Sequence, residues 1–152
     1  RLHADGASVE LTIVGGSENQ TWIDRANRVA NVTYIGAVSQ RQLYDYFAAA
    51  DCLLLPSRFD AFGMVVAEAM AVGIPAIVST TTGAKEMIEK FPGSGWIIDA
   101  DEDAIYNAVK NITEGRWDVT QAGKQALVAA EYFTWQSYRK RVAAVVEEVL
   151  CD

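Results

Sequence analysis

Residues 52–79 read CLLLPSRFDAFGMVVAEAMAVGIPAIVS, and this stretch decides the fold class. It begins with an apolar run at 52–57 and ends with another at 75–79, and both have the length of a strand. Continuous apolar runs of this length are typical of strands that are covered on both faces of a parallel sheet. The segment between them, about 62–71, has helical spacing and is followed by Gly73, a common helix terminator. The stretch therefore predicts a strand–helix–strand unit of a parallel α/β fold.

The same alternation continues on both sides of this unit. We expect further strands at 9–15, 32–36 and 95–99, and further helices at about 19–29, 39–50, 83–90, 101–115, 118–130 and 134–150. The strand at 9–15 is expected to be buried, and Ser39 is expected to cap the helix that follows it. In open parallel sheets, ligands bind outside the carboxyl ends of the strands. The loops after Val14, Ile35, Leu55, Val78 and Ile98 are therefore where a functional site is sought.

Composition limits the class of partner. The chain has 152 residues, of which 51% are apolar, and its 13 basic and 20 acidic residues give a formal charge of -7. This balance argues against nucleic acid as the main partner, although backbone N–H groups can still hold the phosphates of a nucleotide. Two cysteines are too few for a disulfide scaffold, and His3 is the only histidine, so neither a zinc cluster nor a Ser/His/Asp set is expected. With no signal-like segment in the sequence, we expect a cytoplasmic location.

Two carboxylates flank the start of the helix within the deciding stretch. Asp60 precedes the helix, and Glu68 lies eight residues later, about two turns inside it. The unpaired N–H groups of the first helical turn attract an anion such as a diphosphate. Gly63 would let a ligand approach the backbone closely. The pattern favours a ligand with hydroxyl groups on both sides of a phosphate. We expect the basic side chains of Arg58 and Lys85 to be solvated.

At this point the sequence resembles a known family. The Pro-Ser before Asp60, the Phe-Gly after it, and the continuation Glu-Ala-Met-Ala-x-Gly-x-Pro from Glu68 resemble the donor-binding signature of GT-B retaining glycosyltransferases, family 4 (group 1) in particular. The resemblance extends to VELTIVGG, to residues 32–57 and to TTTGAKEMI, and so covers nearly the whole chain. It implies a Rossmann-like, doubly wound parallel sheet. It also implies that residues 1–152 form the C-terminal, nucleotide-sugar-binding domain of such an enzyme.

The resemblance also assigns roles to individual residues. It implies that Glu68 binds the ribose hydroxyls of the nucleotide and that Asp60, as the catalytic position, contacts the transferred sugar. Other positions that match the family's donor-binding segments are the backbone of Phe62, Gly63, Met64 and Val65, the glycine loop at Gly15 and Gly16, and the base-packing loop at Val38, with Ser39 and Gln40. No metal and no cofactor are implied beyond the nucleoside-diphosphate sugar, which is the substrate.

Two features depart from the family pattern. The first acidic position is usually Glu and is Asp60 here, one methylene shorter. The family's donor domain also begins with a strand that ends in Gly-Arg, followed by a Lys, and residues 1–6 resemble only the tail of the helix after it. We therefore expect the sheet to lack its first strand, with a gap in the core. The acceptor-binding N-terminal domain is expected to lie outside this sequence.

Two functions from different classes remain open. The first is the donor-binding half of a retaining glycosyltransferase that moves a hexose from a nucleoside-diphosphate sugar to a hydroxyl acceptor, which is a sugar, a lipid or a protein. The isolated chain is then expected to have little or no activity, and peripheral membrane association of the whole enzyme stays open. The second is a degenerate, non-catalytic module that binds nucleotide or sugar. A dinucleotide-dependent dehydrogenase is disfavoured, because no G-x-G-x-x-G opens a helix.

Overall fold

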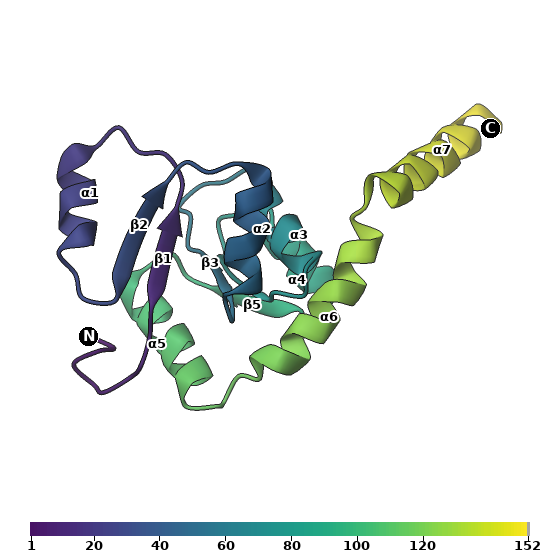
Figure 1. Ribbon diagram of the computed structural model, residues 1–152. Helices are drawn as coiled ribbons and strands as arrows, with labels where there is room; N and C mark the ends of the chain where they lie inside the picture. Colours follow the sequence, from purple (N-terminus) through teal and green to yellow (C-terminus); the bar gives the residue numbers. More distant parts are fainter. Residues whose placement is uncertain (152) are drawn as a thin grey trace.

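The computed structural model describes residues 1–151, which form alternating strands and helices (Figure 1). The strands are β1 (Leu11–Val14), β2 (Val32–Gly36), β3 (Leu53–Leu55), β4 (Ala76–Ser79) and β5 (Gly95–Ile98). The helices are α1 (Gln20–Asn27), α2 (Gln40–Ala48), α3 (Met64–Met70), α4 (Lys85–Lys90), α5 (Glu102–Thr113), α6 (Val119–Tyr132) and α7 (Trp135–Cys151). Every strand pair is parallel, which confirms the predicted α/β class.

The parallel sheet is divided into two hydrogen-bonded parts. One part has the order β1-β2 and the other the order β3-β4-β5. Within the described residues, β1 and β3 therefore each have an inner edge that carries no neighbouring strand. The expected burial of the strand at 9–15 is wrong, because the first two residues of β1 are exposed and the last two are half-buried. Leu11 keeps 39% of its surface exposed.

The core lies against one face of the β3-β4-β5 part. All four residues of β4 are buried, as predicted for 75–79. Alternate side chains of a strand point to the same face, and those of Ala76 and Val78 pack with buried side chains from three helices. These come from α3, α4 and α6 and are Val66, Met70, Ala84, Met87, Ile88, Ala126 and Ala129. Burial on this scale fixes the end of β4 and the start of α4, which border the candidate site.

Helices α1, α2, α5 and α6 each begin after a polar residue whose side chain caps them. The Ser39 side chain accepts a hydrogen bond from the Gln42 N–H, and the Gln42 side chain accepts one from the Ser39 N–H. This reciprocal capping box satisfies two backbone donors at the start of α2. Asp101 caps α5 by accepting from the Ala104 N–H at 2.8 Å. The predicted N-cap of α2 is confirmed.

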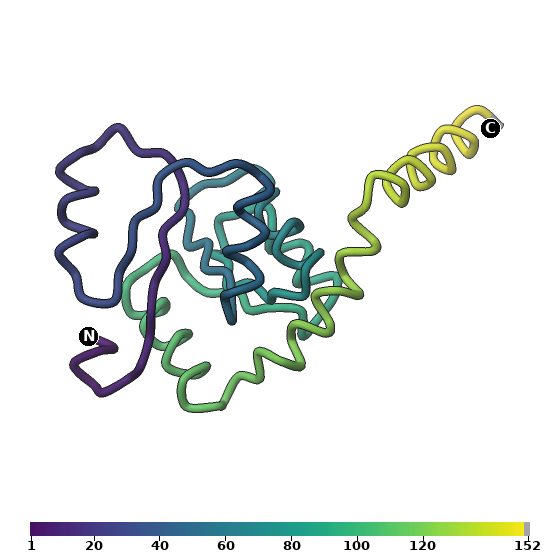
Figure 2. The backbone as a smooth tube through the Cα atoms, in the orientation of Figure 1, coloured from purple at the N-terminus to yellow at the C-terminus, as the bar shows by residue number. Residues whose placement is uncertain are grey.

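Helix α7 projects away from the rest of the molecule (Figure 2). Its apolar side chains follow one another at helical spacing but are exposed, and they include Trp135 (69% exposed) and Val149 (70% exposed). Arg141 ties the helix back to α6, since its guanidinium donates to the Tyr132 carbonyl at 2.7 Å and lies over the Tyr132 ring. Among the described residues, no helix is long and apolar enough to cross a membrane.

Candidate functional site

The Ser57–Gly63 loop after β3 is built around Asp60. One carboxylate oxygen of Asp60, Oδ1, accepts hydrogen bonds from the Phe62 N–H at 3.0 Å and from the Gly63 N–H at 2.7 Å. The Asp60 backbone forms a parallel bridge with Thr82, and its carbonyl accepts from the Gly83 N–H at 2.9 Å. The loop after β3 is thereby joined to the loop after β4. Asp60 holds its own turn and links two of the loops that border the site.

The helix that follows begins later than the sequence suggested. Helix α3 starts at Met64, and Gly63 precedes it in a left-handed conformation, with φ at 71°. The expected start near Phe62 is therefore wrong by two residues, because the left-handed turn at Gly63 interrupts the helical backbone. Of the four N–H groups considered for an anion, those of Phe62 and Gly63 are taken by Asp60. The N–H groups of Met64 and Val65 have no such partner among the described residues.

Glu68 lies in the middle of α3 and is half-buried. Its neighbours Val66 and Ala69 are fully buried, so the helix holds this carboxylate beside the core. Glu68 Oε1 accepts a hydrogen bond of 3.2 Å from Nε2 of Gln40, the first residue of α2. The start of α2 and the middle of α3, which are far apart in the sequence, therefore meet at this carboxylate. The loop before α2 carries Val38, which is half-buried.

The glycine loop at Gly15 and Gly16 follows β1 directly. Gly15 has φ at 142° and donates its N–H to the Gly36 carbonyl at 2.8 Å. The Tyr34 hydroxyl donates to the Gly15 carbonyl at 2.7 Å, and the Tyr34 ring packs edge-on against Trp22. Tyr34 was not among the residues predicted for the site. It could have been found as an aromatic residue of β2, the strand that pairs with the one leading into the glycine loop.

The loop between β4 and α4 adds a basic group and an unusual hydroxyl. Lys85 is half-buried rather than fully exposed, and its Nζ donates to the Thr80 carbonyl at 2.9 Å. The Thr82 Oγ1 atom is buried and has no hydrogen-bond partner. A buried hydroxyl without a partner is costly, and here it lies beside the turn that Asp60 forms. Arg58 is exposed, as expected.

The described residues contain no cluster of metal-binding side chains. Among residues 1–151, no group of three or more His, Cys, Asp or Glu side chains is arranged to hold a metal ion. The candidate site instead offers two carboxylates, backbone N–H groups and glycines. Such an arrangement can hold hydroxyl groups and an anion.

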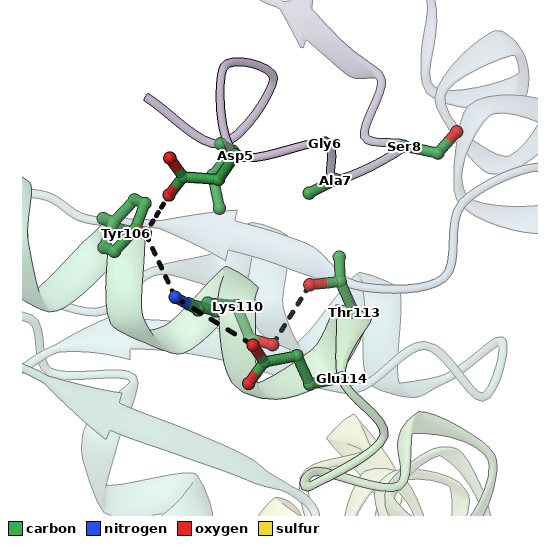
Figure 3. Close-up of a pocket in the computed structure, with 9 residues that line it drawn as sticks. Asp5, Gly6, Ala7, Ser8, Tyr106, Lys110, Thr113 and Glu114 are labelled. Carbon is green, nitrogen blue, oxygen red and sulfur yellow. Dashed lines mark hydrogen bonds and ion pairs between the residues drawn. The ribbon is translucent and has the colours of Figure 1, made fainter.

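A hollow of about 420 Å³ lies elsewhere, at the amino end of β1 (Figure 3). It is formed by the segment before β1 and by α5, and its polar side chains bond mainly to one another. The Tyr106 hydroxyl donates to Asp5, and Lys110 Nζ lies 3.4 Å from that hydroxyl and 4.0 Å from Glu114. This hollow lies at the amino end of β1, whereas the loops described above follow the carboxyl ends of the strands. The hollow is therefore separate from those loops.

Comparison with known proteins identifies the family of the chain. The family described as glycosyl transferases group 1 matches residues 1–127. The chain belongs to this family. The match covers all five strands, the loops that carry Gly15 and Asp60, and helix α3 with Glu68.

One relative of this group 1 glycosyltransferase domain is a Mycobacterium tuberculosis protein, the GDP-mannose-dependent alpha-(1-6)-phosphatidylinositol dimannoside mannosyltransferase. It is 30% identical over 132 residues, which cover 86% of this chain and 34% of the relative. The chain spans about a third of the length of the curated relatives it matches.

Two solved structures show the same fold. Sucrose-phosphate synthase from Thermosynechococcus elongatus is 24% identical with a TM-score of 0.75, and the match covers 93% of this chain and 39% of that one. Anabaena HepE in complex with UDP and glucose is 20% identical with a TM-score of 0.71, and the match covers 91% of this chain and 40% of that one. The fold of this group 1 domain is therefore the Rossmann-like GT-B fold.

Proposed function

We propose that this chain is the donor-binding half of a retaining, family 4 glycosyltransferase that moves a hexose from a nucleoside-diphosphate sugar to a hydroxyl acceptor. The observation that carries the proposal is the meeting of three loops at the carboxyl ends of β2, β3 and β4. Gln40, which begins α2 after the first loop, contacts Glu68 of α3 after the second, and Asp60 of the second loop bridges Thr82 of the third. This is the edge at which parallel sheets bind ligands.

Each part of the donor has a candidate partner at this edge. Glu68 would accept hydrogen bonds from the ribose hydroxyls, and Val38 would pack on the base. The free N–H groups of Met64 and Val65 would face the diphosphate, where the turn of Phe62 and Gly63 lets it approach. Gly15 and Gly16 would border the donor from the β1 side. These positioned donors stabilise the leaving diphosphate, and the proposal involves no metal.

Asp60 is proposed to contact the transferred sugar through its second oxygen. Oδ1 already holds the Phe62 and Gly63 N–H groups, so only Oδ2 is left for a sugar hydroxyl. This fixed geometry would hold Oδ2 still at the point where the sugar departs from the diphosphate. The sugar that fits is then set by the short reach of the Asp60 side chain.

The hydrogen bonds of Asp60 to its own turn also favour a second function. If Asp60 serves only to hold its turn, the chain is a non-catalytic module that binds nucleotide or sugar. Titration of the chain with UDP, GDP, ADP and their glucose or mannose conjugates, followed by calorimetry, distinguishes the two. Tighter binding of a nucleotide sugar than of its free nucleotide supports the donor-binding half. Binding of the free nucleotide alone supports the second function, and the absence of any binding contradicts both.

A matched pair of variants tests the assignment of Glu68. Glu68→Ala should weaken binding of the preferred nucleotide by about tenfold, because a hydrogen-bonded carboxylate contributes roughly 1.5 kcal/mol or more. Glu147→Ala, on the projecting helix α7, removes the same charge at a distance and should leave the affinity unchanged. Equal losses in the two variants would indicate an effect of net charge and would contradict the assignment.

Transfer itself is proposed to need a facing domain that supplies the acceptor site. We predict that the 152-residue chain binds donor but shows little or no transferase turnover in a coupled assay that detects nucleoside diphosphate. Full turnover by this chain would contradict the prediction. The cytoplasmic location expected from the sequence remains a prediction.

A further inference from the structure

The hydrogen bond between Gln40 and Glu68 indicates a role for Gln40 that the family resemblance does not assign. Nε2 of Gln40 lies 3.2 Å from Oε1 of Glu68, and the two residues are 28 positions apart in the sequence. Glu68 forms no ion pair among the described residues, and Gln40 is the partner of its carboxylate in the structure. A carboxylate with one fixed oxygen has one oxygen left to offer to a ligand.

Gln40 is itself held in place by the start of α2. The reciprocal hydrogen bonds between Ser39 and Gln42 fix the backbone on either side of it. Glu68 is held by α3, whose residues Val66, Ala69 and Met70 are fully buried. The contact therefore joins two side chains whose backbones are both fixed. Orienting a binding group before the ligand arrives lowers the entropy cost of binding.

We infer that Gln40 is a positioning residue, which fixes the Glu68 carboxylate so that its second oxygen is directed at the ribose hydroxyls of a nucleoside-diphosphate ligand. The inference rests on the proposed function. It predicts a specific dependence, in which the loss of Gln40 affects only ligands that carry the ribose hydroxyls, and only while Glu68 is present. A general loosening of α2 would affect all nucleotides alike.

The first test measures the contact without any ligand. In the full chain, the side-chain amide signals of Gln40 in a ¹⁵N–¹H spectrum should shift when Glu68→Gln replaces the carboxylate that Gln40 contacts. Gln20, whose side chain bonds to Asp24 within α1 at 2.8 Å, provides a matched amide–carboxylate pair that Glu68→Gln should leave unchanged. A Gln40 signal that ignores Glu68→Gln would overturn the inference.

The second test measures binding of UDP, GDP and ADP, each against its 2′,3′-dideoxy counterpart, by calorimetry. For the nucleotide that binds best, Gln40→Ala should weaken binding by about fivefold, the effect of one net hydrogen bond. The dideoxy counterpart should bind equally to both proteins, and Gln40→Ala should add no further loss in a Glu68→Ala background. Gln20→Ala is the control and should change neither affinity.

The outcomes separate this inference from the function on which it rests. If the unmodified chain binds a nucleotide but Gln40→Ala weakens the normal and dideoxy forms equally, or neither, only the positioning role is overturned. Losses that add in the double variant overturn it as well, because they show that Gln40 acts independently of Glu68. If the unmodified chain binds none of the nucleotides, the proposed function and the positioning role fail together.

Discussion

Gly63 and Gly115 have almost the same left-handed backbone, with φ at 71° and 70°, in different surroundings. A Cβ atom at Gly63 would lie 2.8 Å from the Ala84 Cβ, whereas one at Gly115 would meet nothing within 4 Å. Both alanine variants pay for the left-handed conformation, about 1–2 kcal/mol. Gly63→Ala should lose about 1–3 kcal/mol more through overpacking.

Urea unfolding of the two variants measures this difference. Gly115→Ala is the matched control, because it adds the same side chain at the same φ. Equal losses would show that the contact with Ala84 relaxes without cost. A larger loss at Gly63 would show that the turn before α3 tolerates only glycine.

Cys52, at the start of the apolar run before β3, should be unreactive in the folded protein. Burial raises the pKa of its thiol to about 12 from the usual 9.0, so almost no thiolate is present at pH 8.5. Its contribution to stability is complete below about pH 9 and is lost as the pH rises through about 12. We expect slow alkylation of Cys52 by iodoacetamide at pH 8.5 and rapid alkylation in urea, measured by peptide mapping. Equal rates would contradict the burial.

At the scale of single residues, the sequence indicated candidate side chains for the site but not how they bond. Asp60 and Glu68 were found from their spacing and the motif around them. The bonds from Asp60 Oδ1 to the next two N–H groups depend on a left-handed Gly63, and a sequence pattern does not specify that conformation. The contact between Gln40 and Glu68 could not be predicted either, because it depends on how two helices approach each other in space.

Strands β1 and β3 direct alternate N–H groups toward the division in the sheet. Leu11 and Gly15 donate toward β2, and Leu53 donates toward β4. Since successive residues of a strand face opposite edges, the N–H groups of Thr12, Val14 and Leu54 face the inner edges. We expect these three amides to exchange with solvent about tenfold faster than that of Ile13, as measured by hydrogen exchange with NMR detection. Comparable protection would mean that a further segment, from the same or from a second molecule, covers these edges.

At the scale of elements, local chemistry predicted most helix and strand positions. Ser39 caps α2 and Asp101 caps α5 by short-range bonds that depend only on neighbouring residues, and the Ser39 cap was predicted from the sequence. The start of α3 did not, because a tertiary contact around Gly63 decides it. The burial of β1 was also mispredicted. An apolar sequence shows that a strand can be buried, whereas the neighbours that bury it lie outside its local pattern.

At the scale of the whole molecule, α7 contributes little to the stability of the described fold. Its apolar stripe is exposed, and Arg141 and Ser137 link it to α6 by hydrogen bonds to the Tyr132 and Glu131 carbonyls. A chain that ends at Phe133 should therefore lose less than about 1 kcal/mol in free energy of unfolding, because little apolar surface is newly exposed. Phe133 itself packs against Phe91 and is retained. Urea unfolding of the shortened chain measures the change, and a loss of several kcal/mol would contradict it.

The order of the elements and their parallel arrangement were predictable for the whole chain, because the period of the apolar residues changes at each boundary. The placement of α7 was not. Its stripe of Trp135, Tyr138, Val142, Val145 and Val149 resembles that of a core helix, and only the structure shows that nothing among residues 1–151 covers it.

The division of the sheet also has a consequence for cooperativity. The unit β1–α1–β2 is closed by local pairing, with strands only 21 positions apart in register, whereas the apolar cluster is confined to the other part. Two units with separate ladders and only one large core can unfold at different denaturant concentrations. The β1–α1–β2 unit should open first. The unfolding transitions of this chain recorded by calorimetry and by spectroscopy during heating should therefore fail to coincide.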